Sequence, residues 1–290
     1  MDRQRRHLRR RQMRSSRRSK LNSQTSQRRA RGHVGVLAVV IESNERVGAL
    51  NPQDRFPMQS VYKLPICMAV MEQIDEGKLR IDQKVKIAKE DYVPAAAHSP
   101  IRDKYPKGTE LTVNDLVRFA LSESDGTASD VLLKLAGGRT PVQKYLTDLG
   151  ITDMILLNTE KELAQDWQVQ YQNSATPEAG VALLRALYEQ KGLSESSRAL
   201  VLKYMTESTP GAKRLKGLLP EGTAVAHKTG TSGTQDGITA ATNDIGIITL
   251  PNGKHLAIAV FVSDSPTDDS IREGVIAKVA KLVFDSIAAK

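Results

Sequence analysis

The chain has a single cysteine, Cys67, and therefore cannot form an intrachain disulfide. Because Cys67 lies in an apolar run, we expect it to be a small residue of the core. The five histidines show neither an HxxxH spacing nor a companion CxxC motif, so neither a protein-built metal site nor a metal cofactor is expected. No hydrophobic run reaches the length of a transmembrane helix.

Aromatic residues make up only 4% of the chain, and residues 1–33 contain none. Those residues hold 13 of the 42 lysines and arginines and one acid, which leaves 29 basic and 32 acidic residues for the rest of the chain. The net charge of +9 thus resides in a tail that has too few apolar residues to order itself, and we expect disorder there. Without aromatics for base stacking, the pattern favours a solvated tail, and nucleic acid is not the expected partner.

No secretory signal is recognisable, because the apolar stretch nearest to the basic tail is residues 34–41. We interpret this stretch as a buried strand, since a polar turn and a further ordered segment follow it at once.

The two ends of the sequence predict strands and its middle predicts helices. Residues 245–250 and 256–262 flank an Asn-Gly turn, as in a hairpin. Helices are predicted at residues 64–74, 113–121, 127–136, 141–149, 177–189 and 196–205. From residue 267 a terminal helix is expected, with apolar side chains at helical spacing at Ile271, Val275, Val279, Leu282 and Val283.

This order predicts an α/β (α+β) fold, in which distant segments close an antiparallel sheet flanked by helices and an all-helical domain is inserted. We expect a tail at 1–33, a discontinuous sheet domain at 34–57 and 208–290, and a helical domain at 58–207. Ligands often bind where two such lobes meet.

Ser60 and Lys63 are polar residues in an otherwise apolar helical segment. Residues three apart lie on one helix face, so the hydroxyl and the amine would meet in a poorly hydrated place. A partly exposed helix start with a snorkelling lysine is one explanation. The other is a nucleophilic serine activated by a lysine whose pKa is depressed by burial.

Two further segments carry polar groups in the same order along the chain. Ser124, Asp125 and Gly126 precede a helix, where a helix cap is the simpler interpretation. The segment 228–231, Lys-Thr-Gly-Thr, continues a strand and taken alone suits an ordinary strand edge. Together with Ser60 and Lys63 they match the signature of class A β-lactamases and penicillin-binding proteins. From about residue 34 to its end, the chain resembles a class A serine β-lactamase.

Residues 159–173, TEKELAQDWQVQYQN, resemble the Ω-loop of the PER/VEB-like extended-spectrum branch of that family, within a loop at about 158–174. By this resemblance Glu160 falls at the family's deacylation glutamate, although a solvated surface charge is the simpler interpretation of the residue alone. A penicillin-binding D-Ala-D-Ala carboxypeptidase or transpeptidase has no counterpart to it, and that class is the nearest alternative.

The resemblance implies a role for each of the catalytic residues. Ser60 attacks the lactam carbonyl, and Lys63, or Glu160 through a water, accepts its proton. Ser124, near Lys63 and Lys228, relays a proton to the leaving nitrogen, and Glu160 activates the water that releases the acyl group.

Substrate binding is implied for Lys228, Thr229, Gly230 and Thr231. The backbone N–H groups of Ser60 and Thr231 would form the oxyanion hole. The expected partners are small β-lactam antibiotics, with no cofactor, and a monomer is expected.

Two positions depart from the common family pattern, and two others match family positions through a less specific resemblance. Gly126 replaces an asparagine that contacts substrate, and Ala164 replaces an asparagine that helps to hold the hydrolytic water. Arg214 resembles an arginine placed behind the strand lysine, and a surface arginine is its alternative. His98 lies at an aromatic gate position, and an exposed histidine without a role is its alternative.

The N-terminal region also departs from the family, whose members usually begin with an export signal and a helix that pairs with the C-terminal one. The family implies a periplasmic or secreted location, which the arginine-rich beginning does not itself support. A binding protein that has lost catalysis and uses its tail on nucleic acid is the alternative from a different class.

Overall fold

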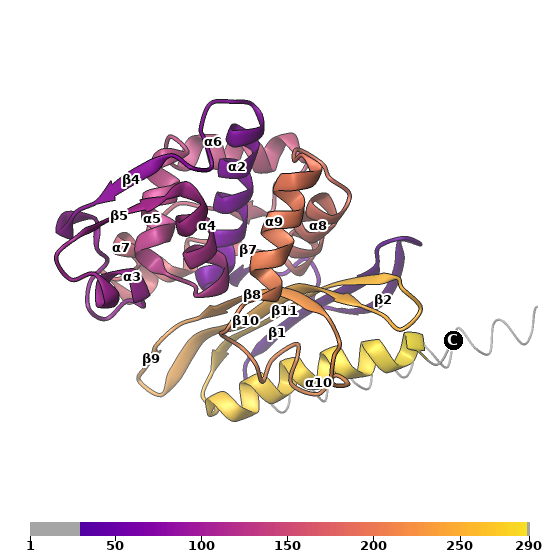
Figure 1. The fold of residues 1–290 in the computed structure, drawn as a ribbon. Helices are drawn as coiled ribbons and strands as arrows, with labels where there is room; N and C mark the ends of the chain where they lie inside the picture. The colour runs from indigo at the N-terminus through magenta and orange to yellow at the C-terminus, as the bar shows by residue number, and fades with distance from the viewer. Residues whose placement is uncertain (1–29, 289–290) are drawn as a thin grey trace, which may run out of the picture.

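The computed structural model describes residues 30–288, and the predictions for residues 1–29 fall outside this range. A large antiparallel sheet lies between the long C-terminal helix on one face and a group of helices on the other (Figure 1). The strands of this sheet are β1 (His33–Val40), β2 (Glu45–Leu50), β8 (Val225–Thr231), β9 (Thr234–Gln235), β10 (Ile238–Thr249) and β11 (His255–Ser265). The longer helices are α2 (Lys63–Asp75), α4 (Val113–Ser122), α5 (Gly126–Leu135), α6 (Arg139–Asp148), α8 (Pro177–Tyr188), α9 (Glu195–Thr206) and α10 (Asp269–Ala288).

Strands from both ends of the sequence lie side by side, as the sequence predicts. The sheet order is β2-β1-β11-β10-β8, with β9 paired to β10. The turn at residues 251–253 joins β10 to β11, and Gly253 has the positive φ of 78° that such a turn requires. The predicted strands and all the predicted helices are therefore confirmed.

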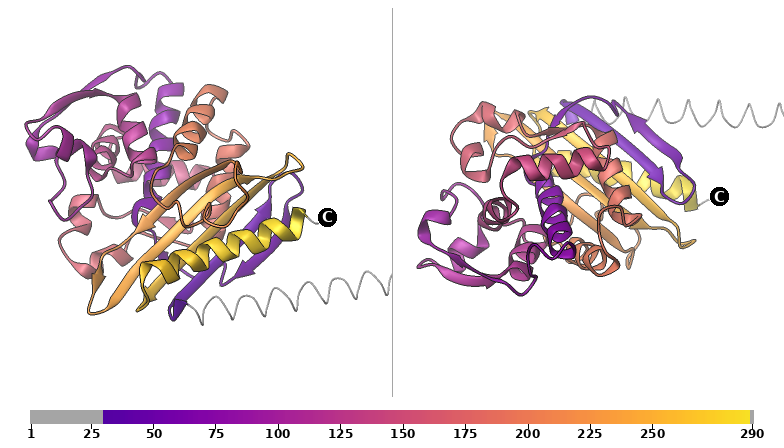
Figure 2. Two further views of the ribbon diagram at one scale, coloured as in Figure 1. Left: turned by 60° about the horizontal axis from the view of Figure 1, so that its bottom comes forward. Right: turned by 90° about the horizontal axis from the view of Figure 1, so that it is seen from above.

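Both faces of the sheet are buried. Successive side chains of β1 point to opposite faces and pack in two separate hydrophobic cores. Leu37 and Val39 join the core shared with the helical region, whereas Val36 and Val40 join the core under α10. Helix α8 packs against the first of these faces and α10 against the second, an arrangement visible in Figure 2.

The apolar helix α2 runs through the middle of the helical region and packs against α4, α5, α6 and α9. Cys67 lies fully buried within it as a free thiol, as predicted for a core residue. Burial raises the pKa of this thiol to about 12, which leaves it unreactive. The domain boundaries predicted at residues 57/58 and 207/208 stay a prediction.

Two small sheets were not predicted from the sequence. Strands β3 (Phe56–Pro57), β7 (Ser174–Ala175) and β6 (Met154–Ile155) form one, and β4 (Lys84–Ile87) and β5 (Thr109–Thr112) form the other. Strands of two to four residues carry too little periodicity to separate them from loops. The first sheet joins the segment before Ser60 to the far end of the loop that carries Glu160.

The C-terminal helix corrects one expectation. Val275, Val279 and Val283 are buried against the sheet, but Ile271 and Leu282 are 43% and 48% exposed. These two residues lie to the side of the stripe that faces the strands, so the predicted apolar face was too wide.

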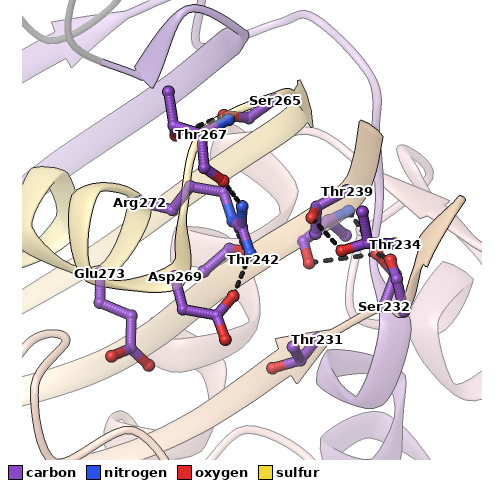
Figure 3. A network of polar contacts seen from close by, with 12 residues as sticks. Thr231, Ser232, Thr234, Thr239, Thr242, Ser265, Thr267, Asp269, Arg272 and Glu273 are labelled. Carbon is purple, nitrogen blue, oxygen red and sulfur yellow. Dashed lines mark hydrogen bonds and ion pairs between the residues drawn. The ribbon is translucent and has the colours of Figure 1, made fainter. Parts of the chain in front are cut away.

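Arg272 fixes the first turn of α10 to the sheet, as Figure 3 shows. Its side chain is buried, its Nε donates to Thr242 Oγ1 at 2.9 Å, and the rest of its guanidinium contacts the Thr267 carbonyl and Asp269. No helix within residues 30–288 is long and apolar enough to cross a membrane.

Candidate active site

Ser60 lies in a short 3-10 helix, η1 (Gln59–Tyr62), directly before Lys63 opens α2. Ser60 is half-buried, whereas the side chain of Lys63 is only 2% exposed. The turn is tied to the sheet by Asn243 of β10, whose Nδ2 donates to the carbonyls of Pro57 at 2.8 Å and Met58 at 3.1 Å.

Gly230 permits β8 to pack directly on this turn. A Cβ at position 230 would overlap the carbonyl oxygen of Met58 and would lie 3.2 Å from Gln59 Cβ. The absence of a side chain therefore sets how closely the strand with Lys228 approaches the helix with Ser60.

Lys63 is the centre of the polar cluster. Its Nζ lies 2.9 Å from Glu160 Oε1 and donates to the Ser124 carbonyl at 2.6 Å. Glu160 is the first residue of α7 (Glu160–Leu163), whose N-cap Thr159 and Glu162 form a capping box. The loop 159–173 thus presents its first glutamate to the lysine of α2.

Ser124 joins the two lysines predicted for the site. Its hydroxyl accepts from Lys228 Nζ at 2.8 Å, while its carbonyl accepts from Lys63. Ser124 has φ of 57°, which is uncommon for a residue with a side chain and is typical of functional positions. Asp125 caps α5 by accepting from Ala128 N, so the cap and the projecting hydroxyl occur together.

Two of these groups have shifted pKa values. Burial alone would raise the pKa of Glu160, but the adjacent Lys63 charge and hydrogen bonds outweigh it, and the pKa is lowered. Complete burial, together with repulsion from Lys63, lowers the pKa of Lys228 to about 7. Glu160 is therefore a carboxylate at neutral pH, whereas Lys228 titrates there.

β8 is an edge strand of the sheet within residues 30–288, so one side of its backbone is not paired with another strand. Arg214 lies buried behind it, with Nη2 donating to Thr231 Oγ1 at 2.7 Å and Nη1 to the Gly230 carbonyl at 3.2 Å. Its Nε lies 3.1 Å from Glu273 of α10. Arg214 is thus the buried arginine behind the strand, not a surface residue.

Thr229, Gly126 and His98 lie around this centre. The Thr229 methyl group faces Gly211, and the residue is buried. A Cβ at Gly126 would lie 3.3 Å from Glu160 Cγ, so this buried glycine packs directly against the Glu160 side chain. His98 is exposed, and its carbonyl accepts from Gly126 N.

Sequence reasoning missed several groups that support Glu160. Asp130 of α5 accepts from the backbone N–H of Glu160 at 2.8 Å and of Lys161 at 3.1 Å. Gln59 donates to Gln170 Oε1 at 2.7 Å and so joins the loop to η1. The residues lie 30 and 111 positions from their partners, and no local spacing predicts such contacts.

Lys63, Ser124, Glu160 and Lys228 thus meet between α2, α5, α7 and β8, and Ser60 lies in the turn that leads into α2. No group of three or more histidine, cysteine or acidic residues in the described part of the chain could hold a metal ion.

Comparison with known proteins identifies the family. The model of the beta-lactamase enzyme family matches residues 17–287. The chain is 45% identical to Beta-lactamase VEB-1 of Pseudomonas aeruginosa over 249 residues, 85% of this chain and 83% of VEB-1. It is 44% identical to Extended-spectrum beta-lactamase PER-1 of the same organism over 237 residues, 81% of this chain and 76% of PER-1.

Solved structures give the same result. The crystal structure of a beta-lactamase from Chitinophaga pinensis superposes with a TM-score of 0.90 at 45% identity, covering 93% of this chain and 99% of that one. The fold predicted from the sequence is confirmed by this match. The chain belongs to the β-lactamase family, within the PER/VEB-like branch of the class A serine β-lactamases.

Proposed function

We propose that the protein hydrolyses the β-lactam amide through an acyl-enzyme on Ser60. The observation that carries the proposal is the contact of Lys63 with both Glu160 and Ser124, while Ser124 also accepts from Lys228. This cluster supplies a proton acceptor and a proton donor beside Lys63, the lysine that follows Ser60 by three residues.

In acylation, Ser60 Oγ bonds to the lactam carbonyl carbon and loses its proton to Glu160 through a water, or to Lys63 after that ammonium has passed a proton to Glu160. The 2.9 Å contact between these two groups lets the proton pass between them. Ser124 donates a proton to the nitrogen as the C–N bond breaks and is resupplied from a lysine. The Ser60 and Thr231 N–H groups stabilise the oxyanion, a contribution of about 3 kcal/mol for each such donor.

In deacylation, Glu160 removes a proton from a water as the water oxygen bonds to the ester carbonyl carbon. The bond from that carbon to Ser60 Oγ then breaks, and the serine oxygen takes the proton back. The lowered pKa of Glu160 keeps it available as a base at neutral pH. Ala164 supplies no amide for this water, so Glu160 and its neighbours orient the water themselves.

The substrate carboxylate binds at the end of β8. Lys228 and Arg214 supply positive charge there, and the hydroxyls of Thr229 and Thr231 donate hydrogen bonds. The glycine at position 126 packs closely against Glu160 and the His98 carbonyl, and it offers no amide to the substrate's side chain. These features fit a small anionic β-lactam.

The nearest alternative is a penicillin-binding carboxypeptidase or transpeptidase. Such an enzyme needs no carboxylate beside the lysine, whereas here Glu160 contacts Lys63 directly. We also propose that the protein is periplasmic or secreted, as is usual for the family, and that it is a monomer.

Steady-state nitrocefin hydrolysis tests the proposed function. We expect many turnovers per enzyme and none above background for Ser60→Ala. Stoichiometric labelling of Ser60 without turnover would instead identify a penicillin-binding protein.

A further inference from the structure

A buried pair of a histidine and an aspartate lies behind β8 and has no role in the proposed chemistry. His227 of β8 and Asp244 of β10 are both 0% exposed, and His227 Nδ1 lies 2.9 Å from each carboxylate oxygen of Asp244. Because an ionised carboxylate only accepts hydrogen bonds, the Nδ1–H group is the donor. Within residues 30–288 the other ring nitrogen, Nε2, has no hydrogen-bond partner. The imidazole therefore makes its polar contact with Asp244.

Two glycines leave space for this imidazole. Gly246 lies opposite His227 in the pairing of β10 with β8, and a Cβ at position 246 would lie 2.8 Å from His227 Cβ. A Cβ at Gly211 would lie 3.5 Å from His227 Cε1. Since successive side chains of a strand point to opposite faces, His227 lies on the face of β8 opposite to Lys228.

Asp244 joins β10 to the segment that carries Arg214. This segment is the connection between α9 and β8, residues 207–224. Asp244 Oδ2 accepts from Leu215 N at 3.2 Å, and the carbonyl of the neighbouring Asn243 accepts from Arg214 Nη1 at 2.9 Å. Two consecutive residues of the connection thus bind two consecutive residues of β10. The backbone at position 215 is therefore fixed directly beside the residue that supplies the guanidinium.

A buried carboxylate is a costly means of holding one backbone N–H group. Removing a charge from water is strongly unfavourable unless hydrogen bonds compensate for it, and an apolar pair would fill the space without that cost. Here His227 and the Leu215 N–H group together donate to both oxygens of Asp244. The pair thus holds the connection at a defined distance from the sheet.

We propose that His227 and Asp244 are positioning residues for Arg214, and through it for the substrate carboxylate. His227 holds Asp244, Asp244 holds the Leu215 N–H group, and Arg214 is thereby kept with Nη2 at 2.7 Å from Thr231 Oγ1. Neither member of the pair touches the substrate, because both are fully buried. The inference rests on the proposed function, in which Arg214 supplies positive charge at the end of β8.

The test replaces His227 by phenylalanine, which keeps an aromatic ring but donates no hydrogen bond. Acylation by nitrocefin, an anionic cephalosporin, is followed by stopped flow over a range of concentrations. A displaced Arg214 binds the carboxylate less tightly, so the concentration that gives half-maximal acylation rate should rise about tenfold. The limiting rate should stay within about threefold, since the groups that act on the lactam bond remain in place.

A double-mutant cycle with Arg214→Ala shows whether the effect acts through the arginine. In the Arg214→Ala background, His227→Phe should change the half-saturating concentration by less than about twofold. His227→Asn, whose amide can donate in place of Nδ1, should restore most of the affinity. Asp244→Asn offers the two donors only one acceptor oxygen, and it should raise the half-saturating concentration as His227→Phe does.

His255→Phe is the matched control. His255, at the start of β11, also contacts a carboxylate through Nδ1, which lies 2.8 Å from Glu42 Oε1 in the turn after β1. This variant removes a contact of the same kind at another place in the sheet. It should leave the half-saturating concentration and the limiting rate within about twofold.

An unchanged half-saturating concentration in His227→Phe would overturn the inference. An equal rise in the Arg214→Ala background or in His255→Phe would also overturn it. If His227→Phe does not fold, judged by circular dichroism, Asp244→Asn carries the same test. Absence of nitrocefin turnover by the unaltered protein would instead show that the proposed function is wrong, so the two failures are distinguishable.

Discussion

Lys228 gives the site a charge that changes near neutral pH. Its pKa is lowered to about 7 by burial and by Lys63, so the free enzyme loses this positive charge as the pH rises through that value. We expect kcat/KM for an anionic β-lactam to fall by up to about tenfold per pH unit above the pKa. The kcat profile should fall at a higher pH, because bound carboxylate stabilises the charged lysine.

The conservative variant Lys228→Arg separates charge from other effects. A guanidinium remains charged at every accessible pH, so the alkaline fall in kcat/KM should disappear even if the plateau is lower. The same fall in the arginine variant would assign the titration to another group.

At the scale of single residues, the sequence predicts the catalytic residues that belong to short motifs. It does not predict the residues that hold those catalytic residues in place. Ser60 and Lys63 share one helical turn, and Lys228 lies in a recognisable tripeptide. Asp130 belongs to no motif that points to Glu160, because its contact with the Glu160 backbone arises from packing between elements distant in sequence. Arg214 could be singled out only by resemblance, and its buried contact with Thr231 required the fold.

At the scale of elements, Gly230 sets the distance between β8 and η1. In Gly230→Ala the new methyl group would overlap the Met58 carbonyl, so the strand and the turn must separate. We expect a loss of kcat/KM of about a hundredfold or more, since a small misplacement of catalytic groups has effects of that size. Acylation kinetics with nitrocefin measure it.

The matched control is Gly233→Ala, just beyond the same strand, where a Cβ would have no neighbour within 4 Å. Its rate should remain close to normal. Similar losses of kcat/KM in both variants would show that the contact between β8 and η1 is not the cause of the loss.

Substitution of Arg272 tests how much its side chain contributes to holding α10 on the sheet. Arg272→Met keeps much of the side-chain volume but leaves the Thr242 hydroxyl and the Thr267 carbonyl without this donor. We expect a loss of about 2–4 kcal/mol in the free energy of unfolding, measured by denaturant titration. Arg80→Met, at an arginine that is 77% exposed, should change it by less than about 1 kcal/mol.

Elements were predicted well where hydrophobic periodicity is strong. The long strands and helices bury one or both faces, which imposes a period of 2 or 3.6 on the sequence. Strands such as β3 and β7 are too short to show a period and exist because neighbouring segments hold them. Ile271 and Leu282 have the correct spacing for α10, yet the sheet covers only the narrower stripe that contains Val275, Val279 and Val283.

At the scale of the whole molecule, the basic N-terminal segment precedes every catalytic residue in the sequence. This segment also carries the chain's excess of positive charge. Deletion of residues 1–29 should leave nitrocefin kcat/KM within about twofold, because every group assigned to catalysis lies at residue 60 or beyond. Any binding to polyanions, with its steep salt dependence, should be lost. A loss of turnover with retained folding, judged by circular dichroism, would contradict this assignment.

The most direct test of the whole account is intact-mass spectrometry of Glu160→Gln after mixing with a cephalosporin. The amide is nearly the same size as the carboxylate but cannot act as a base. We predict a stable adduct on Ser60, while the unaltered protein returns to its free mass within the mixing time. Turnover of the variant at the normal rate, with no accumulated adduct, would contradict the assignment of Glu160 as the base for deacylation.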